Sequence, residues 1–323
     1  AAGIDEVLFM PDYFAIGHKA VDGLHLDLPV SYLDLRLRGD QQDSTDAARR
    51  MAELGVGCIV TLGGDGTNRA VAKTCGDVPL VPISTGTNNV FPYMMEGTVA
   101  GLAAGVVAHG MVPLEQVTRR TKRLDILREG ELIDIALVDV VVYDDMFIAS
   151  RAIWDVSKMR AIVLSRAEPS NIGLSSVGGN LYCTELDRHH GVYLQLGSGK
   201  IQVTAPIAPG LIDRVGITGY RRLAVGDTVE VTHKPSLLAL DGEREVEVRA
   251  DMQVSIRLSD RGPLVVDVAK ALHEAAQHNF FMHGPSRLAS NRTCLLLDAR
   301  ICLAPCIEFM EHELQPEGEQ HGN

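Results

Sequence analysis

The sequence is poor in aromatic side chains and contains no long apolar run. Phe, Trp and Tyr make up 5% of its 323 residues, and there is a single Trp. No stretch approaches the ~20 apolar residues that a helix needs to cross a membrane, and the first residues lack the basic and then apolar pattern of a secretory signal. We therefore expect a protein without a membrane span that resides in the cytoplasm.

Runs of Lys and Arg with interleaved aromatic residues, which are typical of nucleic-acid-binding surfaces, are also absent. The formal net charge is −12 at pH 7, so most of the surface would repel a phosphate backbone. The sequence therefore argues against a nucleic acid as a partner. An anionic ligand would have to be held by a local site.

The six cysteines form no recognisable disulfide or zinc pattern. Cys58, Cys75 and Cys183 stand alone in apolar or helical surroundings, which is typical of reduced core thiols. The other three crowd into the C-terminal part of the chain, where their spacing to His312 matches no common zinc site. We predict no metal site built from protein ligands.

The first part of the chain alternates short apolar runs with helical patterns. Strands are expected at 6–10, 30–37, 58–62 and 79–83, and helices at 44–54, 68–75 and 98–108. Ser44 or Asp46 is the expected cap of the first of these helices. This β-α-β-α order indicates an α/β fold with a mainly parallel sheet and helices on its faces.

From about residue 120 the chain becomes rich in short β-type runs separated by Gly, Asp and Pro turns. These runs are 122–128, 132–143, 159–164, 192–196, 201–204, 228–233, 236–240, 244–249 and 252–258. They predict a second, mostly antiparallel β-rich domain. A strand at 265–269 and a helix at 270–281 are expected to return to the first domain.

Three regions are therefore expected. Residues 1–120 form an N-terminal α/β domain, and residues 121–283 form a β-rich domain with a closing segment that returns to the first domain. Residues 284–323 are atypical, and their polar end is expected to be disordered. Because no strand precedes Glu6, the first strand of the N-terminal domain is expected to be missing.

Two apolar strands each run into a loop of glycines and small polar residues. The first loop covers residues 63–67, Gly-Gly-Asp-Gly-Thr, and the second covers residues 84–89, Ser-Thr-Gly-Thr-Asn-Asn. A strand-to-loop-to-helix turn points several backbone N–H groups at one spot where an anion can bind. We predict that these loops bind nucleotide phosphates.

Asp65 is the informative residue of the first loop. A carboxylate held in a glycine turn can accept a proton from an attacking hydroxyl, or hold Mg²⁺ through water, and phosphoryl transfer needs both. The alternative is a tight turn in which Asp65 merely caps a helix. The loop is neither a Walker A motif nor the Gly-x-Gly-x-x-Gly of dinucleotide folds.

Segment 63–67 resembles the signature of the NAD kinase and diacylglycerol kinase-like superfamily, and its local context is closest to the acetoin-catabolism protein X branch. The resemblance continues in order along the chain, at 84–89, at 136–139 (Ala-Leu-Val-Asp, similar to Ala-Leu-Asn-Glu of NAD kinases), at 176–179, at 205–210 and at the Asp-Gly-Glu of 241–243. Val138 stands where NAD kinases carry the Asn of this motif, and Asp139 stands at the Glu.

The resemblance implies ATP-dependent phosphorylation of a hydroxyl with Mg²⁺, and for NAD kinases that hydroxyl is the 2′-OH of NAD. Asp65 would be the catalytic base. The implied phosphate- and cofactor-binding residues are Gly63, Gly64, Gly66, Thr67, Asn68, Gly86, Thr87, Asn88 and Asn89. The implied substrate-binding residues are Asp139, Ser176, Asp241, Gly242 and Glu243.

Two alternatives remain open at this point. One is a lipid or small-alcohol kinase of the same superfamily, in which Asp241 and Glu243 would be more important than Asp65. The other is a nucleotide-binding accessory protein of acetoin catabolism with weak or no catalysis. In this superfamily the edges of the β-rich domain commonly form oligomers, so we also expect a homo-oligomer.

Overall fold

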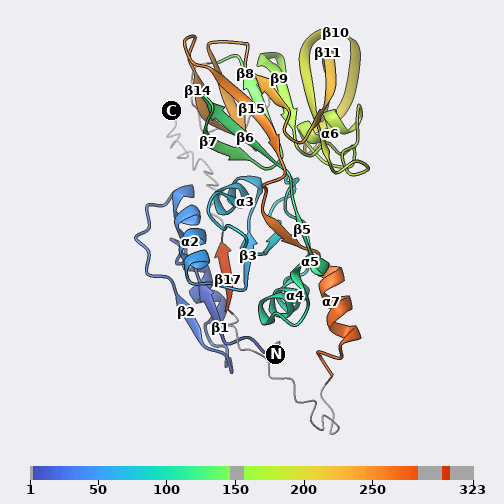
Figure 1. Ribbon diagram of the computed structural model, residues 1–323. Coiled ribbons are helices and arrows are strands. Elements are labelled where there is room, and N and C mark those ends of the chain that lie inside the picture. Colours follow the sequence, from blue (N-terminus) through green and yellow to red (C-terminus); the bar gives the residue numbers. More distant parts are fainter. Residues whose placement is uncertain (1–2, 146–155, 283–299, 306–323) are drawn as a thin grey trace, which may run out of the picture.

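The computed structural model describes residues 3–145, 156–282 and 300–305. These residues form an N-terminal α/β domain and a β-rich domain stacked end to end (Figure 1). The predicted fold class, a mainly parallel α/β domain followed by a mostly antiparallel β domain, is confirmed. No helix in the described part of the chain is both long and apolar enough to cross a membrane.

The N-terminal domain is built on a seven-stranded sheet of order β2-β1-β17-β3-β4-β16-β5. The strands are β1 (Glu6–Phe9), β2 (Val30–Tyr32), β3 (Cys58–Leu62), β4 (Leu80–Ile83), β5 (Thr118–Arg120), β16 (Leu264–Val266) and β17 (Arg300–Pro305). Every neighbouring pair is parallel except β16 with β5. β16 and β17, from the last part of the sequence, therefore belong to the same sheet as β1 and β2.

Helices cover both faces of this sheet (Figure 1). They are α1 (Ile16–Val21), α2 (Gln41–Glu53), α3 (Asp65–Ala72), α4 (Gly97–His109), α5 (Leu114–Val117) and α7 (Val268–Gln277). Successive side chains of a strand point to opposite faces, so Ile59 packs with α2 and α3 while Cys58 and Val60 pack with α4 and α7. Burial on both faces explains the continuous apolar run of β3.

Local chemistry sets the limits of the helices that flank the site. Asp40 caps α2 by accepting a hydrogen bond from the Gln42 amide (2.9 Å), so the prediction of Ser44 or Asp46 as the cap is wrong. Asp40 precedes the first turn and leaves Ser44 inside the helix. Gly55, in the left-handed region at φ 68°, follows the helix end as expected.

Two antiparallel sheets form the β-rich domain, with orders β11-β10-β9-β8-β13-β14 and β12-β15-β6-β7. The strands are β6 (Arg123–Arg128), β7 (Glu131–Ala136), β8 (Asp139–Tyr143), β9 (Met159–Leu164), β10 (His190–Ala208), β11 (Leu211–Ala224), β12 (Thr228–Glu230), β13 (Ser236–Leu240), β14 (Glu243–Val248) and β15 (Val254–Ser259). Apolar side chains of both sheets interdigitate in one core. A short 3₁₀ helix (Val156–Lys158) precedes β9, and α6 (Leu174–Gly179) packs on the other face of the larger sheet.

Two chain segments cross between the domains side by side. The Thr121 amide donates to the Pro263 carbonyl (3.0 Å), and the Gly262 amide donates to the Thr121 carbonyl (3.0 Å). A Cβ on Gly262 would lie 2.6 Å from the Thr121 carbonyl oxygen and 2.8 Å from that of Lys122. Only glycine allows this close approach of the two segments.

Two sequence predictions need correction. Residues 190–208 form one continuous strand, where two short ones were expected, and it pairs with the unpredicted β11. Residues 195–202 of β10 include no buried side chain, and most of β11 is exposed, so these stretches lack the alternation that marks a half-buried strand. Residues 300–305, assigned to an atypical tail, form an interior strand of the first sheet. Cys306 and His312 lie outside the described residues.

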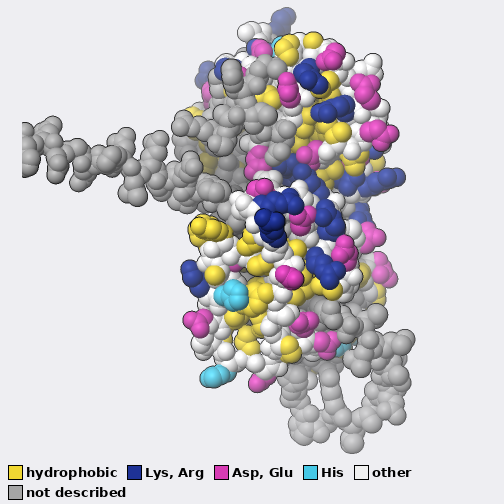
Figure 2. Space-filling view, turned by 90° about the vertical axis from the view of Figure 1, so that its left-hand side faces the viewer, with side chains coloured by type: hydrophobic (Ala, Val, Ile, Leu, Met, Phe, Trp, Pro, Cys, Tyr) yellow, Lys and Arg dark blue, Asp and Glu magenta, His cyan; other side chains and the backbone are white. Residues whose placement is uncertain are grey.

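The face that carries α2 shows acidic and basic side chains interspersed, with basic ones gathered near the junction of the domains (Figure 2). Several basic side chains of α2 and the segment before it have local acidic partners. Arg38 and Arg49 both pair with Asp46, and Arg50 pairs with Glu53. Such exposed pairs add little stability, so packing against the sheet holds α2 in place.

Candidate active site

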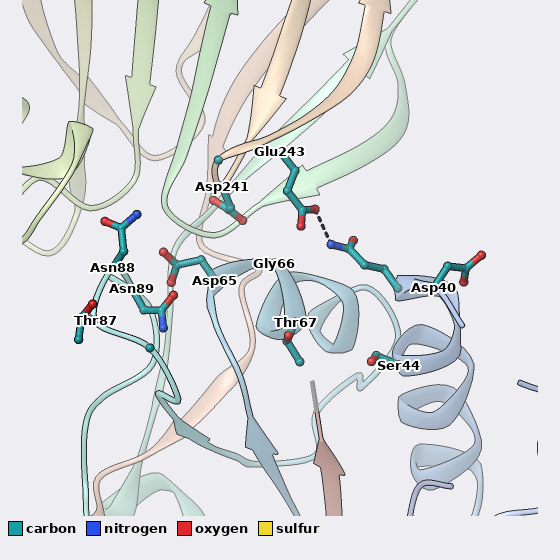
Figure 3. Close-up of a pocket in the computed structure, with 13 residues that line it drawn as sticks. Asp40, Ser44, Asp65, Gly66, Thr67, Thr87, Asn88, Asn89, Asp241 and Glu243 are labelled. Carbon is teal, nitrogen blue, oxygen red and sulfur yellow. Dashed lines mark hydrogen bonds between the residues drawn. The ribbon is translucent and has the colours of Figure 1, made fainter. Parts of the chain in front are cut away.

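A cavity of about 450 Å³ lies where the two domains meet. It is lined by Asp40, Gln41, Ser44, Asp65, Gly66, Thr67, Gly86, Thr87, Asn88, Asn89, Asp241, Gly242 and Glu243. The α2 N-terminus lies on one side and the loop after β4 on the other, with α3 below and the β13–β14 turn above (Figure 3). Both glycine loops and the Asp-Gly-Glu turn therefore converge on one cavity.

Asp65 lies within the glycine loop that follows β3 and is the first residue of α3. Its carboxylate accepts hydrogen bonds from the Val90 amide (3.0 and 3.1 Å) and the Phe91 amide (2.7 Å). Burial, assisted by the nearby charge of Asp241, raises the pKa of Asp65 to about 7 despite these bonds. A carboxylate with this pKa exchanges its proton near neutral pH.

Asp241 faces Asp65 across the cavity from the β13–β14 turn (Figure 3). Its backbone has a positive φ of 51°, a conformation that Asp tolerates in turns. Its carboxylate accepts hydrogen bonds from the amides of Leu137 (2.8 Å), Val138 (2.8 Å) and Asp139 (3.1 Å). Burial still raises the pKa of Asp241, although Arg69 and these amides oppose the shift.

Asp139, the first residue of β8, forms a cluster of three carboxyl groups with Asp65 and Asp241. It does not line the cavity, and its Oδ1 is buried without a hydrogen-bond partner among the described residues. Burial first, and then the charges of Asp241 and Asp65, raise the pKa of Asp139 well above its usual range. At neutral pH the cluster therefore holds protons that exposed carboxyls would have lost.

The second glycine loop is held by its own side chains. The Ser84 hydroxyl donates to the Gly86 carbonyl (2.8 Å), and the Asn89 amide group donates to the Ser84 hydroxyl (2.8 Å). A Cβ on Gly86 would lie 3.2 Å from the Asn89 side chain, so a larger residue would crowd the loop. Thr87 and Asn88 are exposed at its tip.

A polar cluster that sequence reasoning missed closes the side of the cavity next to α2. The Gln41 side chain donates to Glu243, and Arg69, fully buried, pairs with Glu243 (3.1 Å) and Asp134 (3.5 Å). Arg69 also lies 3.9 Å from Asp241. Arg69 could have been found, because it lies four residues after Asp65 and so on the same face of α3.

Asp40 and Ser44 were also missed as cavity residues, because their positions suggest only helix capping. Conversely, five of the residues implied by the resemblance do not line the cavity: Gly63, Gly64, Asn68, Asp139 and Ser176. Asn68 is buried and bonded to the Thr61 hydroxyl (2.6 Å) and the Gly64 carbonyl (2.8 Å). The Ser176 hydroxyl is committed within its own helix turn, to the Gly173 carbonyl (2.6 Å).

Val138 does not face the cavity. It is buried in a small apolar cluster with Phe91, Leu137 and Val265, and only its amide contributes to the site, through the bond to Asp241. This position therefore offers no side-chain polar group to a ligand.

The described residues contain no group of three or more His, Cys, Asp or Glu side chains arranged to hold a metal ion. A Mg²⁺ ion keeps several waters and commonly binds through one or two carboxylates together with substrate phosphates. Asp65 and Asp241 are the carboxylates that fit this mode of binding. The cavity suits a metal that arrives with a phosphate group.

Over 305 residues the chain is 39% identical to "Acetoin catabolism protein X" of Cupriavidus necator, a match that covers 90% of this chain and 84% of that protein. The chain belongs to the acetoin catabolism protein X family. Residues 122–261 match the Acetoin catabolism protein X C-terminal domain, and residues 18–111 match the ATP-NAD kinase N-terminal domain. This chain thus joins a first domain that matches the ATP-NAD kinase model to a β-rich domain that matches the acetoin catabolism protein X model.

Two solved structures are also similar to the chain. An NAD kinase from Archaeoglobus fulgidus in complex with ATP has a TM-score of 0.45 at 14% identity, with 87% of this chain and all of that one covered. A yeast NADH kinase complexed with NADH has a TM-score of 0.41 at 12% identity, with 90% of each chain covered.

Proposed function

We propose that the protein transfers a phosphoryl group from ATP to a hydroxyl, and that the 2′-OH of NAD, giving NADP, is the first acceptor to test. The observation that carries the proposal is Asp65. It is a carboxylate with a pKa of about 7, held at the N-terminal end of α3 inside a cavity lined by two glycine loops.

Asp65 would act as the general base. Its ionised carboxylate takes the proton of the acceptor hydroxyl as that oxygen bonds to phosphorus, and the bond from phosphorus to the leaving oxygen breaks. The Val90 and Phe91 amides fix the direction of the carboxylate. Because these two amides belong to the segment directly after Asn89, the base and the second glycine loop keep a constant geometry.

The loop at residues 63–67, the α3 N-terminus and the loop at residues 84–89 would hold the phosphates. Gly66 and Gly86 carry no side chain that would obstruct a phosphate, and the N-terminal end of a helix favours negative charge. When bound, Mg²⁺ supplies the neutralisation of charge on the phosphate oxygens. Asp65 and Asp241 would orient it directly or through water.

The acceptor would enter from the side of the β-rich domain, where Asp241 and Asp139 lie. Asp241 lines the cavity, whereas Asp139 lies behind it and would act on the site through its charge on Asp65 and Asp241. The burial of Val138 in an apolar cluster favours a second candidate, a smaller or lipid alcohol, because this valine stands in place of the Asn of the NAD kinase motif and offers no polar side-chain group to a dinucleotide.

A product assay with Mg-ATP and a panel of NAD, diacylglycerol and small diols tests the proposal. We expect ADP to form together with one phosphorylated acceptor, and the identity of that product distinguishes the NAD kinase from the lipid or small-alcohol kinase. Nucleotide binding by calorimetry without turnover on any acceptor would instead support an accessory protein. The absence of nucleotide binding would contradict both forms of the proposal.

A further inference from the structure

The carboxylate of Glu243 lies directly over the glycine loop that is proposed to hold phosphate. A Cβ on Gly66 would lie 3.0 Å from Glu243 Oε1 and 3.2 Å from Gln41 Nε2. Glu243 comes from the β13–β14 turn, and Figure 3 shows it pointing down toward the start of α2 and α3. An anionic group of the protein thus already occupies the space next to the first turn of α3.

Two groups that attract a phosphate lie beside this carboxylate. The first turn of α3, an eight-residue helix, has amides without carbonyl partners from the helix itself and carries the positive end of the helix dipole. The guanidinium of Arg69 lies 3.1 Å from Glu243 and is fully buried. A phosphate that approached Gly66 would compete with Glu243 for both groups.

The lining of the cavity is acidic. Among the described residues it includes four carboxylates, Asp40, Asp65, Asp241 and Glu243, and no Lys or Arg. Arg166, which bonds the Val90 and Phe91 carbonyls, acts on Asp65 from outside the lining. Arg69, behind the lining, also pairs with Asp134. A bare polyphosphate would therefore meet net negative charge, whereas a polyphosphate with a bound divalent cation would bring positive charge to the carboxylates.

We propose that Glu243 is a specificity-determining residue that competes with phosphate for the first turn of α3 and for Arg69, so that the cavity selects metal-bound polyphosphate over the bare anion. The proposal rests on the proposed function in one respect, that this cavity is the phosphate site. It predicts that neutralising Glu243 increases affinity for the bare anion more than for the metal complex.

The test measures binding of inorganic pyrophosphate by calorimetry, in EDTA and in excess MgCl₂, for wild type and Glu243→Gln. The amide can still accept a hydrogen bond from Gln41, so the turn stays connected to α2. We expect about tenfold tighter binding of pyrophosphate in EDTA, since a unit charge a few ångströms away is removed, and a change of no more than about twofold with Mg²⁺.

Glu247→Gln is the matched control, because it removes an exposed carboxylate from the same strand. It should leave both affinities within about twofold of wild type. Glu243→Ala, checked for a cooperative thermal transition, should repeat the gain if the Gln variant fails to fold.

Unchanged or weaker pyrophosphate binding by folded Glu243 variants would overturn the inference, as would a failure of all variants to bind pyrophosphate. The result is separable from the proposed function. If the Glu243 variants bind pyrophosphate about tenfold more tightly in EDTA but no acceptor is phosphorylated, the role of Glu243 stands and the kinase activity is contradicted. If an acceptor is phosphorylated but wild type and variants bind pyrophosphate equally, the kinase activity stands and the role of Glu243 is contradicted.

Discussion

Asp65 and Asp241 each use both carboxylate oxygens to hold a backbone segment from another part of the chain. Asp65 holds the amides of Val90 and Phe91, and Asp241 holds the amides that begin at Leu137. Residues that a motif marks as reactive therefore also position the loops around them. Removal of either carboxylate would change geometry as well as chemistry, which is why each test below includes a stability measurement.

Asp139→Asn tests the electrostatic state of the carboxyl cluster. In the folded protein the pKa of Asp139 is raised well above the 3.8 of the unfolded chain. The stability that protonated Asp139 contributes is therefore fully present below pH 3.8, and it is lost as pH rises through the folded pKa. The variant cannot ionise. We expect its free energy of unfolding to exceed that of wild type by roughly 1–3 kcal/mol at pH 8, with no difference near pH 4.

Thermal or urea unfolding of both proteins across this pH range provides the measurement. Asp260→Asn is the control, because it removes an exposed Asp from the same domain and should give a difference that hardly varies with pH. A variant less stable than wild type at pH 8 would mean that the Asp139 anion is well solvated or paired in the folded protein.

At the scale of the element, α3 and its loop are organised by Asn68 rather than by a conventional cap. Gly64 is the N-cap and has no side chain to bond the helix. Asn68 instead reaches back to the Gly64 carbonyl and accepts from Thr61 on β3, at 2.8 and 2.6 Å. The buried amide thus joins the strand, the loop and the helix.

Asn68→Ala should therefore destabilise the protein by about 1–3 kcal/mol, because it leaves the buried Thr61 hydroxyl and Gly64 carbonyl without these bonds. Urea unfolding measures the loss. Asn180→Ala is a matched control: Asn180 also bonds a carbonyl four residues earlier (2.8 Å), but it is exposed and should cost much less. Equal losses would show that Asn68 has no special role.

The predicted elements that coincide with the structure are those whose signal is local. Cys58–Leu62, Met159–Leu164 and Ser236–Leu240 are strands at the predicted residues, because each is an apolar run bounded by turn residues. The β10–β11 hairpin lacks such a pattern. β17 was missed because its partners, β1 and β3, lie far away in sequence.

The same contrast holds for the site. Both glycine loops and the Asp-Gly-Glu turn are contiguous motifs, and the sequence locates all three. Gln41, which lines the cavity, and Arg69, behind its lining, both contact Glu243, which lies 202 and 174 positions away in sequence. Only the tertiary structure brings these groups together.

For the whole molecule, the cavity lies between two connections of the domains. On one side the crossing segments meet at Thr121 and Gly262, and on the other the Gln41–Glu243 and Arg69–Asp134 contacts join α2 and α3 to the β-rich domain. The relative position of Asp65 and Asp241 depends on both connections.

Gly262→Ala should disturb the crossing, since the added methyl group would lie 2.6 Å from the Thr121 carbonyl oxygen. We expect a loss of about 1–3 kcal/mol in stability and weaker nucleotide binding, measured by thermal unfolding and calorimetry. Gly101→Ala, on α4, has open space around the added carbon and should be neutral or slightly stabilising. If both variants behave alike, the crossing does not constrain the domains.

The proposed phosphoryl transfer depends most on Asp65 as the proton acceptor. The most direct measurement is the rate of ADP formation from Mg-ATP, with the acceptor that gives product, for wild type and Asp65→Asn at pH 8, alongside their thermal midpoints. We expect the variant to fold and to form ADP about 10²- to 10⁴-fold more slowly than wild type. Equal rates, or no turnover by the wild type on any acceptor, would contradict this proposal.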